Sequence, residues 1–167
     1  MNPEFAVAFR DMELANLKQE SATTRRVIQA VPDARKDYRP DPKYMTAHEL
    51  AWHIVSAEVS LLEGVAARQF ATGGPRPEKP GTIADILAWY DGHLPKTLDK
   101  VKAMSGPELT TIVEFAGVMK FPAVAYLRLV DVHSVHHRGQ LSTYLRPMGA
   151  KVPSIYGPSA DEAWPPR

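Results

Sequence analysis

Residues 131–141 read Asp-Val-His-Ser-Val-His-His-Arg-Gly-Gln-Leu, and this stretch decides what we expect of the fold. Apolar and aromatic residues recur around it with a helical period over 122–145, which predicts one long amphipathic helix. Residues four apart in a helix lie on the same face, one turn apart. His133 and His137 are therefore expected side by side on the face that turns toward the core.

Three earlier segments show the same periodicity, and each has signals that begin or end a helix. The first is expected over 3–30, the second over 46–70 and the third over 82–104. Thr46 and Glu49 form a capping-box pattern at the start of the second helix. Pro95 is expected to kink the third helix or to begin a new turn. Four such helices with long connections predict an all-α fold, a four-helix bundle.

The remaining segments are read as connections. Residues 72–81 are expected to be a long connection, and Ser105-Gly106-Pro107 a break. The β-branched stretch 110–115 is compatible with a short strand or an extended loop. After the last helix we expect an extended, Pro-rich C-terminal tail packed on the bundle and anchored by Tyr156 and Trp164. The whole chain, 1–167, is expected to form a single domain.

Composition excludes several classes of function. The 167 residues include 20 basic and 19 acidic side chains, and no basic stripe indicates nucleic-acid binding. The absence of cysteine excludes disulfides, Cys-ligated zinc and a cysteine nucleophile. We see no signal peptide and no apolar run long enough for a membrane span, so we expect a cytoplasmic protein without membrane or nucleic-acid partners.

A third histidine makes a metal site a reasonable hypothesis. His53 lies on the inward face of the second predicted helix. Three neutral imidazoles with an open position are typical of a catalytic zinc site, although imidazole also suits nickel, copper and iron. The competing interpretation is that His53, His133 and His137 are core histidines that hydrogen-bond within the protein.

Residues beside these histidines have two interpretations each. Glu49 completes the capping box, or it orients His53 or receives a proton. His136 points about 100° away from His137, which favours a position at the rim or behind the ligands. Arg138 and Gln140 are a surface arginine and a helix-end amide, or they fix the His137 ring or meet a substrate.

Gly139 lies between these two residues, inside the predicted helix. Glycine there costs about 1 kcal/mol relative to alanine. Its presence suggests the close approach of another backbone.

These motifs together resemble the DinB-like (YfiT-like) superfamily. The resemblance rests on Leu-x-x-His at 50–53 and His-x-x-x-His-Arg-Gly-Gln at 133–140, with flanking motifs at 31–40 and 144–157, so it covers nearly the whole chain. It implies a four-helix bundle, often dimeric. It also implies a divalent metal, nickel or zinc, held by His53, His133 and His137.

The resemblance implies a reaction class less directly. Some relatives transfer low-molecular-weight thiols such as bacillithiol or mycothiol, which suggests a thiol S-transferase acting on a small electrophile. Arg138, Gln140 and Tyr144 are then candidates to contact the external thiol or the substrate, and no catalytic residue is assigned. Two alternatives stay open: a hydrolase in which the metal activates water with Glu49 as base, and a non-catalytic metal-binding stress or interaction protein. A homodimer is a further expectation.

Overall fold

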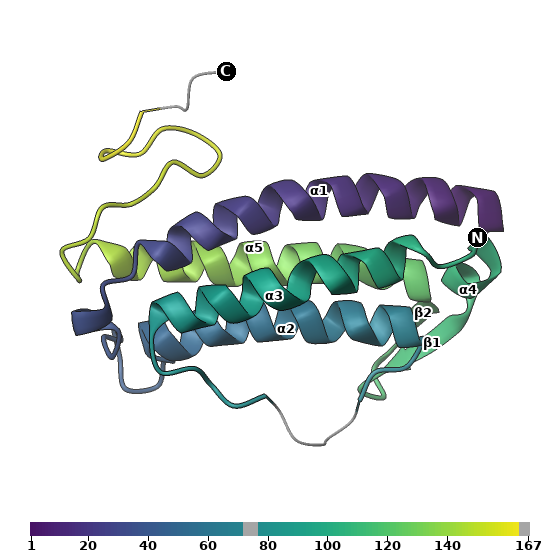
Figure 1. Cartoon of the computed structure of the whole chain (residues 1–167), viewed down its shortest axis with the longest axis horizontal. Coiled ribbons are helices and arrows are strands. Elements are labelled where there is room, and N and C mark those ends of the chain that lie inside the picture. Colours follow the sequence, from purple (N-terminus) through teal and green to yellow (C-terminus); the bar gives the residue numbers. More distant parts are fainter. Residues whose placement is uncertain (72–76, 164–167) are drawn as a thin grey trace.

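The computed structural model describes residues 1–71 and 77–163, and most of these residues are helical, as the sequence predicts. Four long helices lie side by side along the long axis of the molecule (Figure 1). They are α1 (Pro3–Gln29), α2 (Ala47–Ala67), α3 (Ile83–Lys102) and α5 (Tyr126–Leu145). Each corresponds to one of the helices expected from the sequence.

The four helices enclose one apolar core. α2 packs against α3 and α5, and α1 packs against the same two helices, so α1 and α2 lie on a diagonal. α1 and α5 run in one direction along the molecule and α2 and α3 in the other (Figure 1). Large side chains that are almost fully buried between them are Leu17, Ile28, Leu50, Ile54, Leu62, Ile86, Leu127 and Leu141.

Side-chain caps fix where the helices begin. The Thr46 hydroxyl accepts the Glu49 backbone N–H at 3.1 Å, and the Glu49 carboxylate accepts the Thr46 N–H at 2.8 Å, so the predicted capping box is present. Thr82 caps α3 by accepting the Asp85 N–H at 3.1 Å. These interactions satisfy backbone donors that the first helical turn leaves without partners.

One expectation about helix boundaries is wrong. Ser105-Gly106-Pro107 is not a break but the start of a short helix, α4 (Gly106–Thr110), because Pro107 suits the first turn and the Glu108 carboxylate accepts the Ser105 N–H at 2.8 Å. Pro95 lies inside α3, which continues to Lys102. The missing Pro95 N–H leaves the carbonyl of Asp91 without its helical donor, and Asp91 is exposed to water.

The segment between α4 and α5 includes a β-hairpin. β1 (Ile112–Phe115) pairs antiparallel with β2 (Met119–Pro122), which resolves the two interpretations of 110–115 in favour of a strand. The 3₁₀ turn η2 (Ala123–Ala125) then leads into α5, as η1 (Asp33–Arg35) follows α1. The Tyr126 hydroxyl donates to the Val113 carbonyl at 2.8 Å and thereby attaches the hairpin to the first turn of α5.

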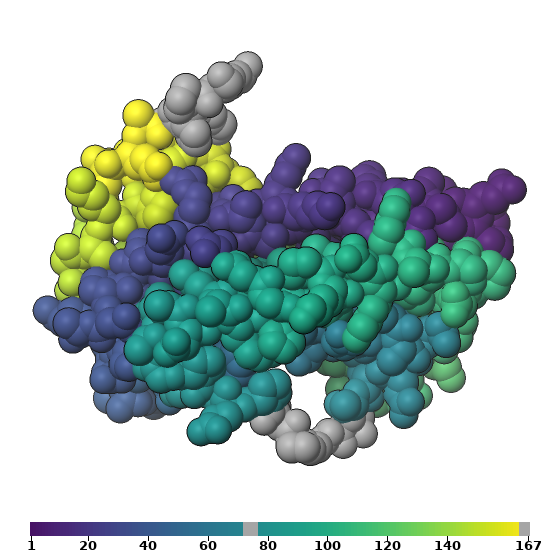
Figure 2. All heavy atoms as spheres, viewed as in Figure 1, coloured from purple at the N-terminus to yellow at the C-terminus, as the bar shows by residue number. Residues whose placement is uncertain are grey.

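The segment after α5 contains no helix or strand up to residue 163. Figure 2 shows its yellow part lying against the C-terminal half of α1. Glu162 pairs with Arg26 of α1 at 2.5 Å, and the Tyr156 hydroxyl donates to Glu20 of α1 at 2.8 Å. The second expected anchor, Trp164, lies outside the described residues, as do residues 72–76 of the predicted connection at 72–81; its described part, 77–81, contains no helix or strand.

α2 is the one described helix that is long and apolar enough, by length and composition, to cross a membrane. Half of its most apolar window is buried against other helices of the same domain.

Candidate metal centre

Three histidines meet at the seam where α2 packs against α5. His53 comes from α2, and His133 and His137 come from successive turns of α5. The ring centroids of His133 and His137 are 4.5 Å apart, and that of His53 is 5.0 Å from the first and 4.6 Å from the second. One ring nitrogen from each residue lies within 4.8 Å of the others. The structure therefore brings together the three residues selected from the sequence.

The local sequence explains why the three histidine rings meet at this position along α2 and α5. The Thr46 cap fixes the start of α2, and His53 follows on its second turn. α5 runs antiparallel to α2, so its C-terminal half faces the N-terminal half of α2 (Figure 1). All three rings are half-buried, which places them at the edge of the core and within reach of a solvent-borne ligand.

The environment keeps His133 neutral. Burial, together with the neighbouring rings of His137, His53 and His136, lowers the pKa of its imidazole to about 4. A neutral imidazole can donate a lone pair to a metal ion. The Nδ1 atom of His133 is buried without a hydrogen-bond partner among the described residues. A metal ion bound at Nδ1 would supply that partner.

His137 is held by the next turn of its own helix. Its Nδ1 lies 3.1 Å from the Oε1 atom of Gln140. The amide nitrogen of Gln140 donates in turn to the Tyr144 hydroxyl at 3.3 Å. Tyr144 is buried, and its ring packs edge-on against Tyr38 with centroids 5.9 Å apart. Of the roles expected for Gln140, the geometry supports the one in which it fixes the His137 ring.

The donor set suits a divalent transition metal. Imidazole nitrogens are ligands for zinc, nickel, copper and iron, whereas magnesium and calcium prefer oxygen. Among the described residues these histidines are the one group of three or more His, Asp or Glu side chains close enough to share an ion. Three protein ligands would leave further coordination positions open.

Comparison with known proteins places this arrangement in a family. The family model described as "DinB family" matches residues 9–167. The chain belongs to the DinB family. It is 25% identical over 155 residues to "Uncharacterized protein YrdA" of Bacillus subtilis (strain 168), a match that covers 91% of this chain and 90% of YrdA.

Solved structures agree with the family assignment. The crystal structure of a DinB-like protein from Bacillus cereus ATCC 10987 aligns with a TM-score of 0.73 and 26% identity, over 86% of this chain and 95% of the other. A DinB-like protein of Bacillus subtilis, YjoA, aligns with a TM-score of 0.71 and 19% identity, over 87% of this chain and 97% of the other. The comparison with YjoA, at 19% identity, shows that the two proteins share a fold.

Arg138 of this DinB-family protein does not lie in the metal centre. Its side chain is 1% exposed and points toward α1, where it pairs with Glu20 at 2.6 Å and donates to the Thr24 hydroxyl at 3.3 Å. It also donates to the Tyr156 hydroxyl at 2.6 Å. The expectation that Arg138 is a surface residue, fixes His137 or meets a substrate is thus replaced by a role in joining α1, α5 and the C-terminal segment.

Glu49 serves the capping box, the first of its expected roles. The side chain is exposed, and its Oε2 atom accepts from both the N–H and the hydroxyl of Thr46. These hydrogen bonds hold the pKa of Glu49 below its ordinary value. A carboxylate that already accepts two hydrogen bonds, and whose pKa is lowered, is a poor general base.

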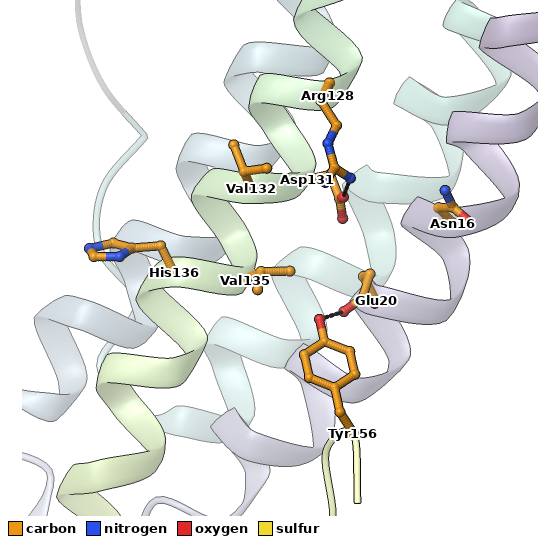
Figure 3. Close-up of a pocket in the computed structure, with 8 residues that line it drawn as sticks. All are labelled: Asn16, Glu20, Arg128, Asp131, Val132, Val135, His136 and Tyr156. Carbon is orange, nitrogen blue, oxygen red and sulfur yellow. Dashed lines mark hydrogen bonds and ion pairs between the residues drawn. The ribbon is translucent and has the colours of Figure 1, made fainter.

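His136 and Gly139 lie on the outer side of α5. His136 is exposed and is one of the residues that line a groove of about 410 Å³ between α1 and α5, with its ring pointing away from α1 (Figure 3). Its ring centroid is nevertheless 4.8 Å from that of His137. The expectation of a close backbone beside Gly139 is wrong, because a Cβ atom added there would meet nothing within 4 Å.

A buried polar pair was missed by the sequence analysis. Glu58 of α2 is 1% exposed, and its Oε2 atom accepts from the Ser134 hydroxyl of α5 at 2.9 Å. The Tyr90 hydroxyl also lies near enough to lower the pKa of Glu58, but its geometry falls short of a hydrogen bond. A signal existed in the sequence: Glu58 lies midway between Ile54 and Leu62 on the apolar face of its helix.

Proposed function

We propose that this DinB-family protein is a metal-dependent enzyme of the thiol S-transferase type, in which an external low-molecular-weight thiol attacks a small electrophile. The carbon–sulfur bond would form as the bond to the leaving group breaks, and the thiol proton would pass to solvent. The observation that carries the proposal is the half-buried cluster of His53, His133 and His137 at the α2–α5 seam.

The histidines would hold nickel or zinc, and an open three-histidine site supplies Lewis acidity that lowers the pKa of a bound thiol. Burial keeps His133 neutral and available as a ligand. Gln140 orients His137 through its Nδ1 atom. The chain has no cysteine, so the nucleophilic sulfur must come with the co-substrate.

The hydrolytic alternative is less well supported. It needs a base for the attacking water, and Glu49, the acid that we had placed beside a ligand, is occupied by Thr46 and has a lowered pKa. A transferred thiol brings its own nucleophile and needs no such base. The non-catalytic alternative predicts metal binding without turnover, which the experiment below separates from catalysis.

Other features belong to the same proposal. The four long helices are taken to form the four-helix bundle that the family resemblance implies, with the C-terminal segment as its extended tail. We expect a cytoplasmic protein that acts on a small molecule, without nucleic-acid or membrane partners, and that forms a homodimer.

The test is a screen of metal-loaded protein with bacillithiol, mycothiol and simpler thiols against several electrophiles, followed by product mass. The proposal predicts metal-dependent thioether formation that His133→Ala abolishes. His93→Ala is the matched control, because His93 is exposed on α3 and stacks on Trp89 away from the cluster. Metal binding without product from any pair would favour the non-catalytic alternative.

A further inference from the structure

His133 and His137 differ in which ring nitrogen is already used within the protein. His137 Nδ1 has a partner in the Gln140 side chain, whereas His133 Nδ1 has none among the described residues and can bind the metal itself. Histidines that bind metals commonly donate their other ring N–H to an acceptor, which fixes the tautomer and the orientation of the ring. Gln140 is such an acceptor for His137.

We propose that Gln140 is the positioning residue of this site: it holds His137 in the Nδ1–H tautomer, so that Nε2 is the atom offered to the metal. This inference rests on the proposed metal centre and assigns Gln140 and Tyr144 a role different from contact with substrate. It concerns His137 alone among the three ligands.

The chemistry of the amide carries the assignment. Gln140 Oε1 is an acceptor without a proton, so the hydrogen bond at 3.1 Å requires that His137 Nδ1 donates. A neutral imidazole has one N–H, which leaves the lone pair on Nε2. The opposite amide orientation would direct an N–H at Nδ1, and the His137 proton would then sit on Nε2 and block the metal.

Tyr144 secures the far end of the amide. Its hydroxyl accepts from Gln140 Nε2 at 3.3 Å, and its ring is buried beside Tyr38. Gln140, His137 and Tyr144 lie on one face of α5 at spacings of three and four residues, so the relay is built within a single helix. A rigid element of this kind positions a site more accurately than a loop does.

Two measurements test the assignment. Long-range proton–nitrogen NMR of the metal-free protein, labelled with ¹⁵N-histidine and assigned with His137→Ala, reads the tautomer of His137 directly. Visible-absorption titration with Co²⁺ then gives the metal affinity of the wild type, Gln140→Met, Gln140→Glu and the control Gln19→Met. Gln19 is exposed on α1, a helix that contributes no histidine to the cluster.

The expected result is a protonated Nδ1 in the wild type and a mixture of tautomers in Gln140→Met. Loss of the acceptor should weaken Co²⁺ binding by about 10- to 100-fold. Gln140→Glu keeps an acceptor and should bind at least as tightly as the wild type, whereas a role in packing alone would favour Met over Glu. Gln19→Met should match the wild type.

The failures are distinguishable. A wild-type protein that takes up no Co²⁺ refutes the metal centre and the role of Gln140 with it. Wild-type uptake with an unchanged affinity in Gln140→Met refutes only the positioning role. Protonation of His137 at Nε2 in the metal-free wild type refutes the tautomer assignment, and this measurement does not depend on any variant folding.

Discussion

Replacing Glu58 by Gln should change how the stability of the protein depends on pH. Glu58 is an acid in the core, 1% exposed, with one hydrogen bond, from Ser134 at 2.9 Å. Burial raises the pKa of its carboxyl from 4.5 to about 7, against the lowering effect of Ser134, Tyr90 and Arg138. Glutamine has nearly the same shape and keeps an oxygen for Ser134, but it cannot ionise.

The sign follows from proton linkage. Between about pH 4.5 and 7 the folded protein keeps a proton on Glu58 that the unfolded chain has lost, so this group makes the free energy of unfolding fall as pH rises. One pKa unit corresponds to about 1.4 kcal/mol. From pH 5 to pH 8 the penalty from Glu58 should therefore grow by about 2 to 3 kcal/mol.

The assay is urea unfolding of the metal-free protein at pH 5, 6, 7 and 8, with a chelator present because metal binding is itself pH-dependent. The difference in free energy of unfolding, Glu58→Gln minus wild type, should rise by that amount and level off above pH 7. Glu114→Gln, on the exposed face of the hairpin, is the control for the chemical change from Glu to Gln. A flat difference for Glu58→Gln would refute the reasoning.

Three further predictions concern stability. Arg138→Met should lower the free energy of unfolding by about 3 kcal/mol, because a buried pair broken on one side leaves Glu20 without its cation; a loss as small as that of an exposed pair, under about 1 kcal/mol, would contradict it. Thr46→Ala should cost about 1 kcal/mol in urea unfolding through the lost cap, and no change would remove the cap from the account. Tyr126→Phe should cost about 1 kcal/mol and speed amide exchange in β1, where the hydroxyl meets Val113; unchanged exchange there would show that the hairpin is held by other contacts.

Periodicity and caps were enough to predict the helices and the histidine cluster. His133 and His137 are four residues apart, and helix geometry alone puts them on one face. His53 follows a recognisable cap at Thr46, so its face could be predicted as well. These features depend on residues that are close in sequence, which is why they could be predicted without coordinates.

The predictions that were wrong concern residues whose surroundings are set by segments far away in the sequence. Arg138 follows His137 directly, but about 100° of helix rotation turns it toward α1, where Glu20 and Thr24 lie more than 100 residues earlier. Gly139 looked like a contact point because glycine is costly in a helix, yet its surroundings are open. The packing of one helix against another decides where such side chains point and what surrounds them. Local sequence patterns do not contain this information.

The most direct test of the central claim is the metal content of protein purified without an affinity tag or chelator, measured beside His133→Ala/His137→Ala and the control His93→Ala. The account predicts about one equivalent of nickel or zinc per chain, held by the three imidazoles, that is lost in the double variant and retained in the control. Protein that contains no metal and takes up neither ion on titration, or a double variant that binds as the wild type does, would contradict the account.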